Sequence, residues 1–226
     1  MSDKVVLCDI DSRGVATVTI NRPEVNNAYN GDVINGLLDG LKFLETENNV
    51  RVIVLRGNGR HFQAGADLKW INEVSGKSEE DNILVSKNTT DAIRFLDCCR
   101  IPTIALVHGG CFGGGTGIIA ACDIVIASND AFFSISEVRW GLHAGPILPQ
   151  LAAAIGTRNL RRYALTGERF GAEKAHNMGL VHEVCPEGGL DVAASPVIES
   201  VLQNGPESIS DTKRIILEVM DLEIDD

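Results

Sequence analysis

Short strand-like runs alternate along this chain with longer helix-like segments, and this alternation limits the fold more than any other feature. Strands that are separated by helices pair in parallel, so the pattern indicates an α/β fold. The strand-like runs are residues 5–10, 15–20, 51–55, 103–107, 123–127, 131–134 and 179–184. The helix-like runs begin near residues 32, 93, 118, 148, 191 and 206.

Local patterns support these predictions. Residues 11–14, Asp-Ser-Arg-Gly, separate the first two strand-like runs and are typical of a hairpin turn. Val33, Leu37 and Leu41 follow one another at four-residue spacing, which places them on one face of a helix. Residues 73–88 are polar and charged, and we expect them to lead into the next helix.

The chain length predicts one domain with a small appendage, because 226 residues exceed the size of a typical domain only slightly. Two adjacent glycines at 188–189 are typical of a hinge. We therefore expect a core at residues 1–190 and a shortened helical C-terminal region at residues 191–226.

Composition excludes several classes of function. The chain has 31 acidic and 20 basic residues, a formal net charge of −11, which argues against nucleic-acid binding. It has no run of about 18 apolar residues, so we expect no membrane partner. Its first residues lack a signal core and an Arg-rich transit segment. The six cysteines form no zinc-type cluster, which predicts reduced thiols, no metal and a cytoplasmic location.

Two segments place backbone amides where a loop becomes a helix, residues 61–69 and 109–117. Free N–H groups at such a position stabilise negative charge. The second segment lacks the ending of a Walker loop, and Ile118 stands where a dinucleotide fingerprint has glycine. Close packing of backbone is the alternative explanation for the glycines. The two segments together indicate an oxyanion hole, in which paired N–H donors hold a developing oxyanion.

Several further motifs follow one another in a distinctive order. They are Asn21-Arg22-Pro23, Asn27-Ala28, His61-Phe62-x-Ala64-Gly65-Ala66-Asp67-Leu68, Pro102-Thr103-Ile104-Ala105, Gly113-Gly114-Gly115, Ala121-Cys122-Asp123-Ile124, Ser136-Glu137-x-x-x-Gly141 and Leu165-Thr166-Gly167-Glu168. This order resembles the crotonase (enoyl-CoA hydratase/isomerase) superfamily over residues 5–190. The resemblance implies a spiral of repeated ββα units with a short helical C-terminal region. It also implies assembly as a homotrimer or as a hexamer, a dimer of trimers.

The resemblance further implies an acyl-CoA thioester as substrate, with coenzyme A as part of that substrate and no separate cofactor. The thioester oxygen is expected between the N–H groups of Ala66 and Gly114. Arg22 and Lys69 stand at positions where basic residues of the family contact the phosphates of CoA. The alternative interpretation is that both are solvated charges on the surface. The full set expected to line the substrate site is Arg22, Ala64, Gly65, Asp67, Lys69, Gly113, Gly117, Arg139 and His143.

One departure from the family pattern concerns the acid–base groups. Hydratases of this family use two glutamates, and the first of these positions is Gly117 here, which cannot transfer a proton. The second position is Glu137, which is therefore expected to be the single catalytic carboxylate, with a helix-start or ion-pair role as the alternative. Arg139 is a candidate partner for a carboxylate on the substrate. His143 is a candidate acid or base, with packing as the alternative.

A single carboxylate leaves three functions open. It can activate a water that adds to a branched or carboxylated 2-enoyl-CoA. The chain resembles the bacterial methylglutaconyl-CoA and isohexenylglutaconyl-CoA hydratases, which act in leucine or terpene catabolism. The carboxylate can instead move a double bond from position 3 to position 2 by proton transfer. The third possibility is a non-catalytic acyl-CoA-binding protein. The acyl group and the product stereochemistry are not determined by the sequence.

The resemblance also places the end of the chain earlier than in typical family members. Helices that close the CoA site and the trimer contact are therefore expected to be shortened or missing. Lys213 is a candidate contact to the CoA adenine region of a neighbouring subunit.

Overall fold

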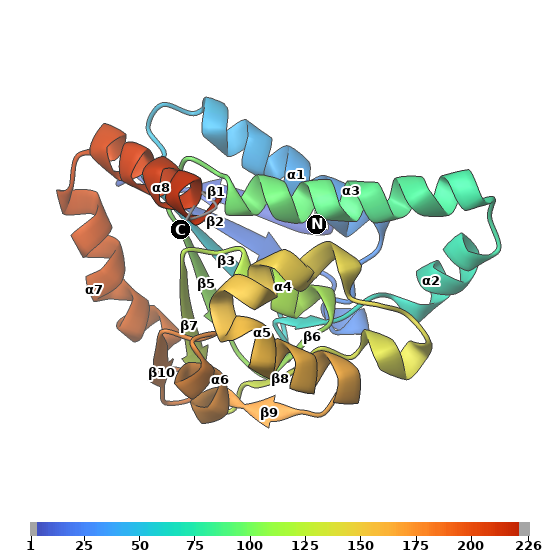
Figure 1. The fold of residues 1–226 in the computed structure, drawn as a ribbon. Helices are drawn as coiled ribbons and strands as arrows, with labels where there is room; N and C mark the ends of the chain where they lie inside the picture. Colours follow the sequence, from blue (N-terminus) through green and yellow to red (C-terminus); the bar gives the residue numbers. More distant parts are fainter. Residues whose placement is uncertain (1–3, 222–226) are drawn as a thin grey trace, which may run out of the picture.

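The computed structural model describes residues 4–221 and shows a spiral of ββα units built around two sheets (Figure 1). The α/β class predicted from the alternation is confirmed. The large sheet has the strand order β1-β2-β3-β5-β7-β10, and the small sheet has the order β4-β6-β8-β9. From the second unit onward, each unit gives its first strand to the large sheet and its second strand to the small one.

The large sheet is parallel except at its first strand, which forms the predicted hairpin. Val6 pairs with Ile20 and Ile10 with Ala16 in antiparallel register. The Asp11 carboxylate closes the turn by accepting from the N–H groups of Arg13 at 2.8 Å and Val15 at 3.0 Å. The strands of this sheet are β1 (Val6–Ile10), β2 (Val15–Ile20), β3 (Val52–Gly57), β5 (Thr103–Val107), β7 (Ile124–Ser128) and β10 (Glu183–Cys185).

The small sheet consists of short strands, and β4, β6 and β8 pair in parallel. Its strands are β4 (Gln63–Ala64), β6 (Gly110–Phe112), β8 (Phe132–Ser134) and β9 (Phe170–Gly171). The helices are α1 (Gly31–Thr46), α2 (Leu68–Ser75), α3 (Glu79–Asp97), α4 (Gly114–Ala120), α5 (Leu148–Thr166), α6 (Ala172–Met178), α7 (Leu190–Gln203) and α8 (Pro206–Asp221). Three 3₁₀ turns are η1 (Pro23–Val25), η2 (Glu137–Trp140) and η3 (Gly145–Ile147).

The main core lies between the large sheet and helices α1, α3 and α4, with α1 and α3 side by side (Figure 1). The predicted apolar face of α1 is buried, including Val33, Leu37 and Leu41. Cys111 and Cys122 are also buried in this core, where they act as small apolar side chains. Helix α7 covers the opposite face of the large sheet through a second, smaller cluster. Helix α7, the first of the two helices in the C-terminal region, therefore packs on its own chain.

Helix α3 begins earlier than the sequence predicted, since the polar stretch at residues 79–88 is already helical. Ser78 is its N-cap and accepts from the N–H of Asp81 at 3.2 Å. Acidic residues fill its first turn, where the helix dipole favours them. Helix α4 also starts earlier, at Gly114, because the glycine run itself adopts helical geometry. Local capping and turn chemistry thus decided both boundaries.

Lys213 on α8 forms an ion pair within its own chain. Its Nζ lies 2.8 Å from Oδ2 of Asp123, and the Lys213 residue is only 9% exposed. The same carboxylate oxygen accepts from the N–H and the hydroxyl of Thr103. Within the described residues, Lys213 therefore fastens α8 to the start of β5 and β7 through an internal ion pair, and its contact to the CoA of a neighbouring subunit stays a prediction.

No helix within residues 4–221 has both the length and the apolar character that crossing a lipid bilayer requires.

Replacement of Lys213 by Met removes one partner of this half-buried ion pair. We expect a loss of about 1–3 kcal/mol in unfolding free energy, because Asp123 keeps its bonds to Thr103 but loses its counter-charge. Urea denaturation measures the loss, and limited proteolysis shows whether α8 is released first. Arg214→Met is the matched control, since Arg214 pairs with Glu218 on the exposed side of the same helix. Equal stability of the two variants would contradict the role of Lys213.

Candidate active site

The site lies where β4, β6 and β8 end. These strands are parallel neighbours, with Ala64 opposite Phe112 and Phe112 opposite Ser134. The segments that follow the three strands therefore emerge side by side at one edge of the small sheet. Ligands of α/β proteins typically bind at the carboxyl ends of such strands. The first two segments carry the predicted amides and the third carries Glu137.

The first turn is held by a buried glutamine. The Gln63 side-chain oxygen accepts from the N–H of Gly65 at 2.9 Å, and its amide nitrogen donates to the Gly65 carbonyl at 3.2 Å. The N–H of Ala64 donates to the Asn26 carbonyl at 3.1 Å, so Ala64 belongs to the frame of the turn. Gln63 was not predicted as a site residue, and its pattern in the sequence gave no signal of this role.

The second turn requires glycine for two reasons. Gly113 has a φ of +49°, which residues with a side chain rarely adopt. A Cβ atom at Gly113 would also lie 2.9 Å from Oε1 of Glu137 and 3.7 Å from the Cα of Gly65. The structure thus brings together the three predicted residues Gly65, Gly113 and Glu137. Each turn has one free donor, since neither Ala66 N–H nor Gly114 N–H bonds to another residue in the described part of the chain.

Glu137 is the carboxylate that lies beside the second turn, with its Oε1 next to Gly113. Its Oε2 is buried and has no hydrogen-bond partner among the residues that the structure describes. Burial raises the pKa of Glu137, although a backbone hydrogen bond works in the opposite direction. A carboxyl group with a raised pKa exchanges protons more readily near neutral pH, which suits general acid–base chemistry.

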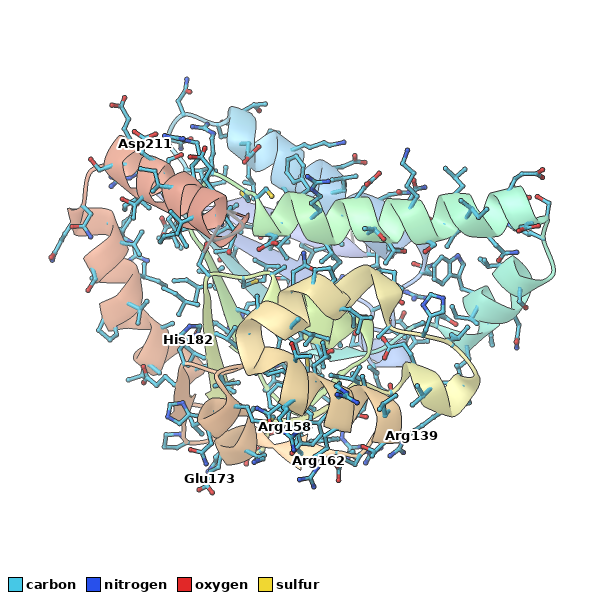
Figure 2. The ribbon with its side chains drawn as sticks, in the orientation of Figure 1. Arg139, Arg158, Arg162, Glu173, His182 and Asp211 are labelled. Carbon is cyan, nitrogen blue, oxygen red and sulfur yellow. The ribbon has the colours of Figure 1, made fainter. Side chains whose placement is uncertain are left out.

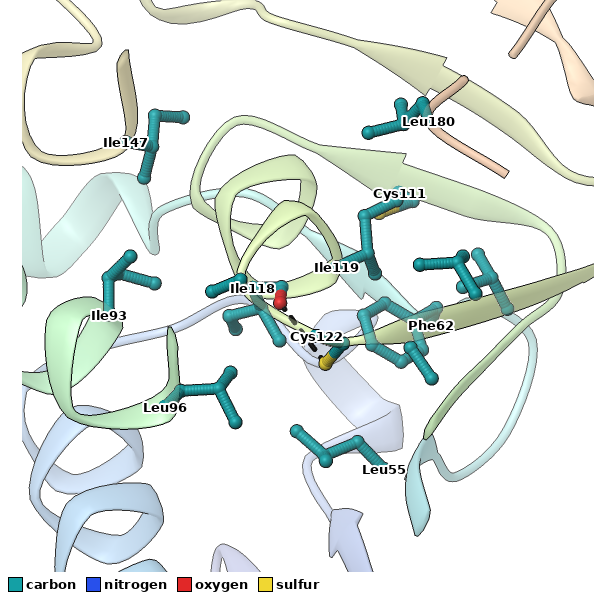
Figure 3. Packing of buried hydrophobic residues seen from close by; sticks show 14 of the residues in the cluster. Leu55, Phe62, Ile93, Leu96, Cys111, Ile118, Ile119, Cys122, Ile147 and Leu180 are labelled. Atoms are coloured by element: carbon teal, nitrogen blue, oxygen red, sulfur yellow. Dashed lines mark hydrogen bonds between the residues drawn. The ribbon is translucent and has the colours of Figure 1, made fainter. Parts of the chain in front are cut away.

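Gly117, predicted as a position that lines the substrate site, is covered instead by Ile147. A Cβ atom at Gly117 would lie 2.1 Å from Cγ2 and 2.5 Å from Cβ of Ile147. Ile147 is only 2% exposed and packs beside α4 (Figure 3). The space beside position 117, where the resemblance implies the first of two glutamates, therefore holds the aliphatic side chain of Ile147.

Tyr29 connects both turns, and the sequence reading missed it. Its N–H donates to the Gly65 carbonyl at 2.9 Å, and its carbonyl accepts from the N–H of Asp67 at 2.8 Å. Its ring lies against Gly114, whose Cβ would be 2.5 Å from Tyr29 Cε1. Burial and the charge of Glu137 both raise the pKa of the Tyr29 hydroxyl, so it stays protonated. An aromatic residue between the Asn27-Ala28 motif and the start of α1 was the available signal.

The predicted basic residues differ in their surroundings. Arg22 forms an ion pair with Asp67, with Nη2 3.0 Å from Oδ2, and also donates to the Ala28 carbonyl at 2.5 Å. Asp67 is the N-cap of α2 and accepts from the N–H of Lys69 at 3.0 Å. Burial acts to raise the pKa of Asp67, but the bonds from Arg22 and from the helix N–H groups lower it overall. Lys69 is exposed beside them, so it is the freer cation of the two.

Arg139 and His143 lie farther out. The Arg139 side chain extends along Gly167, whose Cβ would be 3.0 Å from its Nε, and it is exposed at the lower edge of the molecule (Figure 2). His143 is also exposed, and its Nδ1 accepts from the N–H of Gly145 at 3.3 Å. The described contacts thus give both residues local roles, and their predicted contacts with substrate stay predictions.

The arrangement offers two N–H donors, one carboxyl group and an apolar wall. Donors of this kind stabilise a negative oxygen that develops during a reaction. The carboxyl group can add or remove one proton beside that oxygen. Ile147 leaves the opposite side without a proton-transfer group. The geometry therefore supports enolate chemistry with a single acid–base residue.

Gly117→Ala tests the close contact with Ile147. Alanine normally stabilises a helix interior relative to glycine, but here we expect a loss of about 1–3 kcal/mol from overpacking. Chemical denaturation measures this loss. Gly76→Ala is the control, because its neighbours stand at ordinary distances of 3.7 Å or more and its backbone is helical. A stabilised Gly117→Ala protein would show that Ile147 does not fill this space.

Glu137→Gln tests the burial of the carboxyl group. Because the folded pKa is raised, the unfolded chain ionises at lower pH, and the folded state loses stability as pH rises above the unfolded value of about 4.3. We expect the glutamine variant to be more stable than the parent protein at pH 7. The difference disappears below about pH 4, where Glu137 is protonated in both states. Urea denaturation across this pH range measures the difference in unfolding free energy between the two proteins. A difference that does not change with pH would contradict the raised pKa of Glu137.

Comparisons with known proteins agree with this geometry. Residues 11–223 match the model of the enoyl-CoA hydratase/isomerase family. A hydroxycinnamoyl-CoA hydratase-lyase of Pseudomonas fluorescens is 36% identical over 209 residues, 90% of this chain and 74% of the relative. A peroxisomal Δ3,5-Δ2,4-dienoyl-CoA isomerase of Arabidopsis thaliana is 34% identical over 217 residues, 91% of this chain and 78% of the relative.

Comparison with solved structures points to the same family. The crystal structure of an enoyl-CoA hydratase from Shewanella pealeana superposes with a TM-score of 0.94 at 34% identity, covering 98% of this chain and 82% of that one. Sequence, fold and the placement of Glu137 beside two free amides lead to one assignment. The chain belongs to the enoyl-CoA hydratase/isomerase family of enzymes, the crotonase superfamily.

Proposed function

We propose that this protein adds water to a 2-enoyl-CoA thioester, with Glu137 as its single acid–base residue. One observation carries the proposal. The Glu137 carboxylate lies beside Gly113 of the second turn with one buried, unpartnered oxygen, while Ile147 fills the space beside Gly117. The similarity to a hydratase-lyase at 36% identity supports water addition.

The reaction begins with the thioester oxygen between the N–H groups of Ala66 and Gly114. Glu137 accepts a proton from a water molecule as the water oxygen bonds to C3, and the electrons of the double bond move onto the thioester oxygen. The resulting enolate is stabilised by the two N–H donors. Glu137 then returns its proton to C2, which restores the carboxylate and completes the addition of one water.

Isomerisation is the second candidate, favoured by the apolar wall that Ile147 forms. A bound water needs at least two polar partners, and the side chain at 147 supplies none. In this route Glu137 removes a proton from C2 of a 3-enoyl thioester, and the dienolate that forms at the same two N–H groups takes this proton back from Glu137 at C4. Several relatives, including the Arabidopsis protein, are named dienoyl-CoA isomerases.

Reaction in ¹⁸O-labelled water separates the candidates. We expect the product of crotonyl-CoA or 3-methylglutaconyl-CoA to carry ¹⁸O at C3. A 3-enoyl-CoA that is converted to the 2-enoyl isomer without label would establish the second candidate instead. Binding without either reaction would leave the non-catalytic acyl-CoA-binding role. Mass spectrometry of the thioester products measures all three outcomes.

Glu137→Gln is the matched control for this experiment. We expect it to lower kcat by about 10²–10⁴-fold, the usual contribution of a general acid–base residue, while acyl-CoA binding is retained. An unchanged rate would remove Glu137 from the mechanism and with it the proposed reaction.

The choice of a branched or carboxylated acyl group belongs to the same proposal. Without an acid at position 117, a carboxylate on the substrate meets no like charge from that side. Arg139→Ala tests whether Arg139 pairs with a carboxylate on the substrate. An unchanged preference for 3-methylglutaconyl-CoA over crotonyl-CoA in this variant would exclude the pairing.

Trimeric or hexameric assembly and a cytoplasmic location stay predictions. Light scattering measures the assembly.

A further inference from the structure

An apolar cavity lies directly behind Gly114. It has a volume of about 40 Å³ and is lined by residues of α1, α3 and α4 together with Tyr29. Apolar side chains form most of its wall, and Figure 3 shows Ile93, Leu96 and Ile118 gathered at the junction of α3 and α4. The lining residues are Tyr29, Val33, Ile34, Leu37, Leu41, Thr89, Ala92, Ile93, Leu96, Gly114 and Ile118.

This cavity extends along the α1–α3 seam. On α1 its wall runs from Val33 to Leu41, eight residues or roughly 12 Å at the helical rise of 1.5 Å per residue. Its volume nevertheless corresponds to only a few water-sized spheres. The space is therefore long and narrow, which suits methylene groups in shape but has room for few of them.

Tyr29 lines this cavity beside Gly114 of the second turn, and its backbone bonds to the first turn. Its ring lies against Gly114, and its hydroxyl is close enough to Glu137 for the two to interact electrostatically. One edge of the ring thus faces the site where a thioester is expected, and the other lines the cavity. An acyl chain that leaves the thioester toward the cavity meets the phenol ring first.

The ring is also held firmly in place. The Tyr29 backbone bonds to both Gly65 and Asp67, on either side of Ala66. Trp70 of α2 contacts the ring edge-on, with 5.8 Å between ring centroids. These bonds fix the backbone from which the ring projects, and Trp70 supports the ring from one side, so the ring is a barrier in the conformation that the structure shows.

We propose that Tyr29 is a specificity-determining residue that limits the length of the acyl group by closing the α1–α3 cavity. This inference rests on the proposed function, because it presumes a thioester at the two amides. It names the substrate class more narrowly: short acyl groups, branched or unbranched, whose chain ends before the phenol ring. Removal of the ring joins the cavity to the thioester site and admits longer chains.

Binding of saturated acyl-CoA thioesters tests this inference without relying on turnover. Acetyl-, butyryl- and octanoyl-CoA are titrated by calorimetry into the full chain and into Tyr29→Ala. We expect the parent protein to bind octanoyl-CoA at least tenfold more weakly than butyryl-CoA, and Tyr29→Ala to reduce this ratio at least tenfold. Tyr29→Leu replaces the alanine variant if circular dichroism shows that the latter is unfolded.

Two matched variants identify the ring as the cause. Tyr29→Phe keeps the ring and loses the hydroxyl, so the parent ratio is expected. Thr89→Ala enlarges the same cavity from the α3 side without opening it, so the ratio again stays. A change with phenylalanine as large as with alanine would overturn the inference, because the hydroxyl rather than the ring would then set the limit.

The outcomes separate this inference from the proposed function. If the parent protein binds butyryl- and octanoyl-CoA equally, or if Tyr29→Ala keeps the parent ratio, the length limit is wrong while the proposed reaction stands. If the parent protein binds none of the three thioesters, the proposed function fails and the inference fails with it.

Discussion

Parallel pairing of three very short strands is the constraint on which the site depends. Strands β4, β6 and β8 contain two or three residues each, yet their register makes three chain segments leave the sheet at one edge. No long-range side-chain contact is needed to bring the two amides together, because the backbone ladder does so. The helices that follow each strand then keep the turns from separating.

Glu137 is placed where the fold gains nothing from its charge. One of its oxygens is buried without a partner, so folding must remove that oxygen from water without replacing its hydrogen bonds. Such an arrangement is typical of functional groups, whose environment serves the reaction rather than stability. The Arg22–Asp67 pair shows the opposite case, since both charges are satisfied and hold the frame of the first turn.

Much of the fold was predictable because hydrophobic periodicity and turn residues report local structure directly. The hairpin and the buried face of α1 followed from such patterns. The pairing of the turns at Ala66 and Gly114 was expected from the resemblance, whereas the short strands β4 and β6 that bring them together were not predicted. Ile147, Tyr29 and the Lys213–Asp123 pair were not predictable, because each depends on which side chain fills a space formed by distant segments. Sequence spacing carries no information about such complementary volumes.

The contact between Gly117 and Ile147 has a consequence for how this protein can change over time. A carboxylate does not fit at position 117 while isoleucine fills this space, and loss of the isoleucine alone leaves a void in the core. Either single step is disfavoured, although the two together are compatible. A site with two acids is therefore separated from this chain by an epistatic barrier, because both positions must change together.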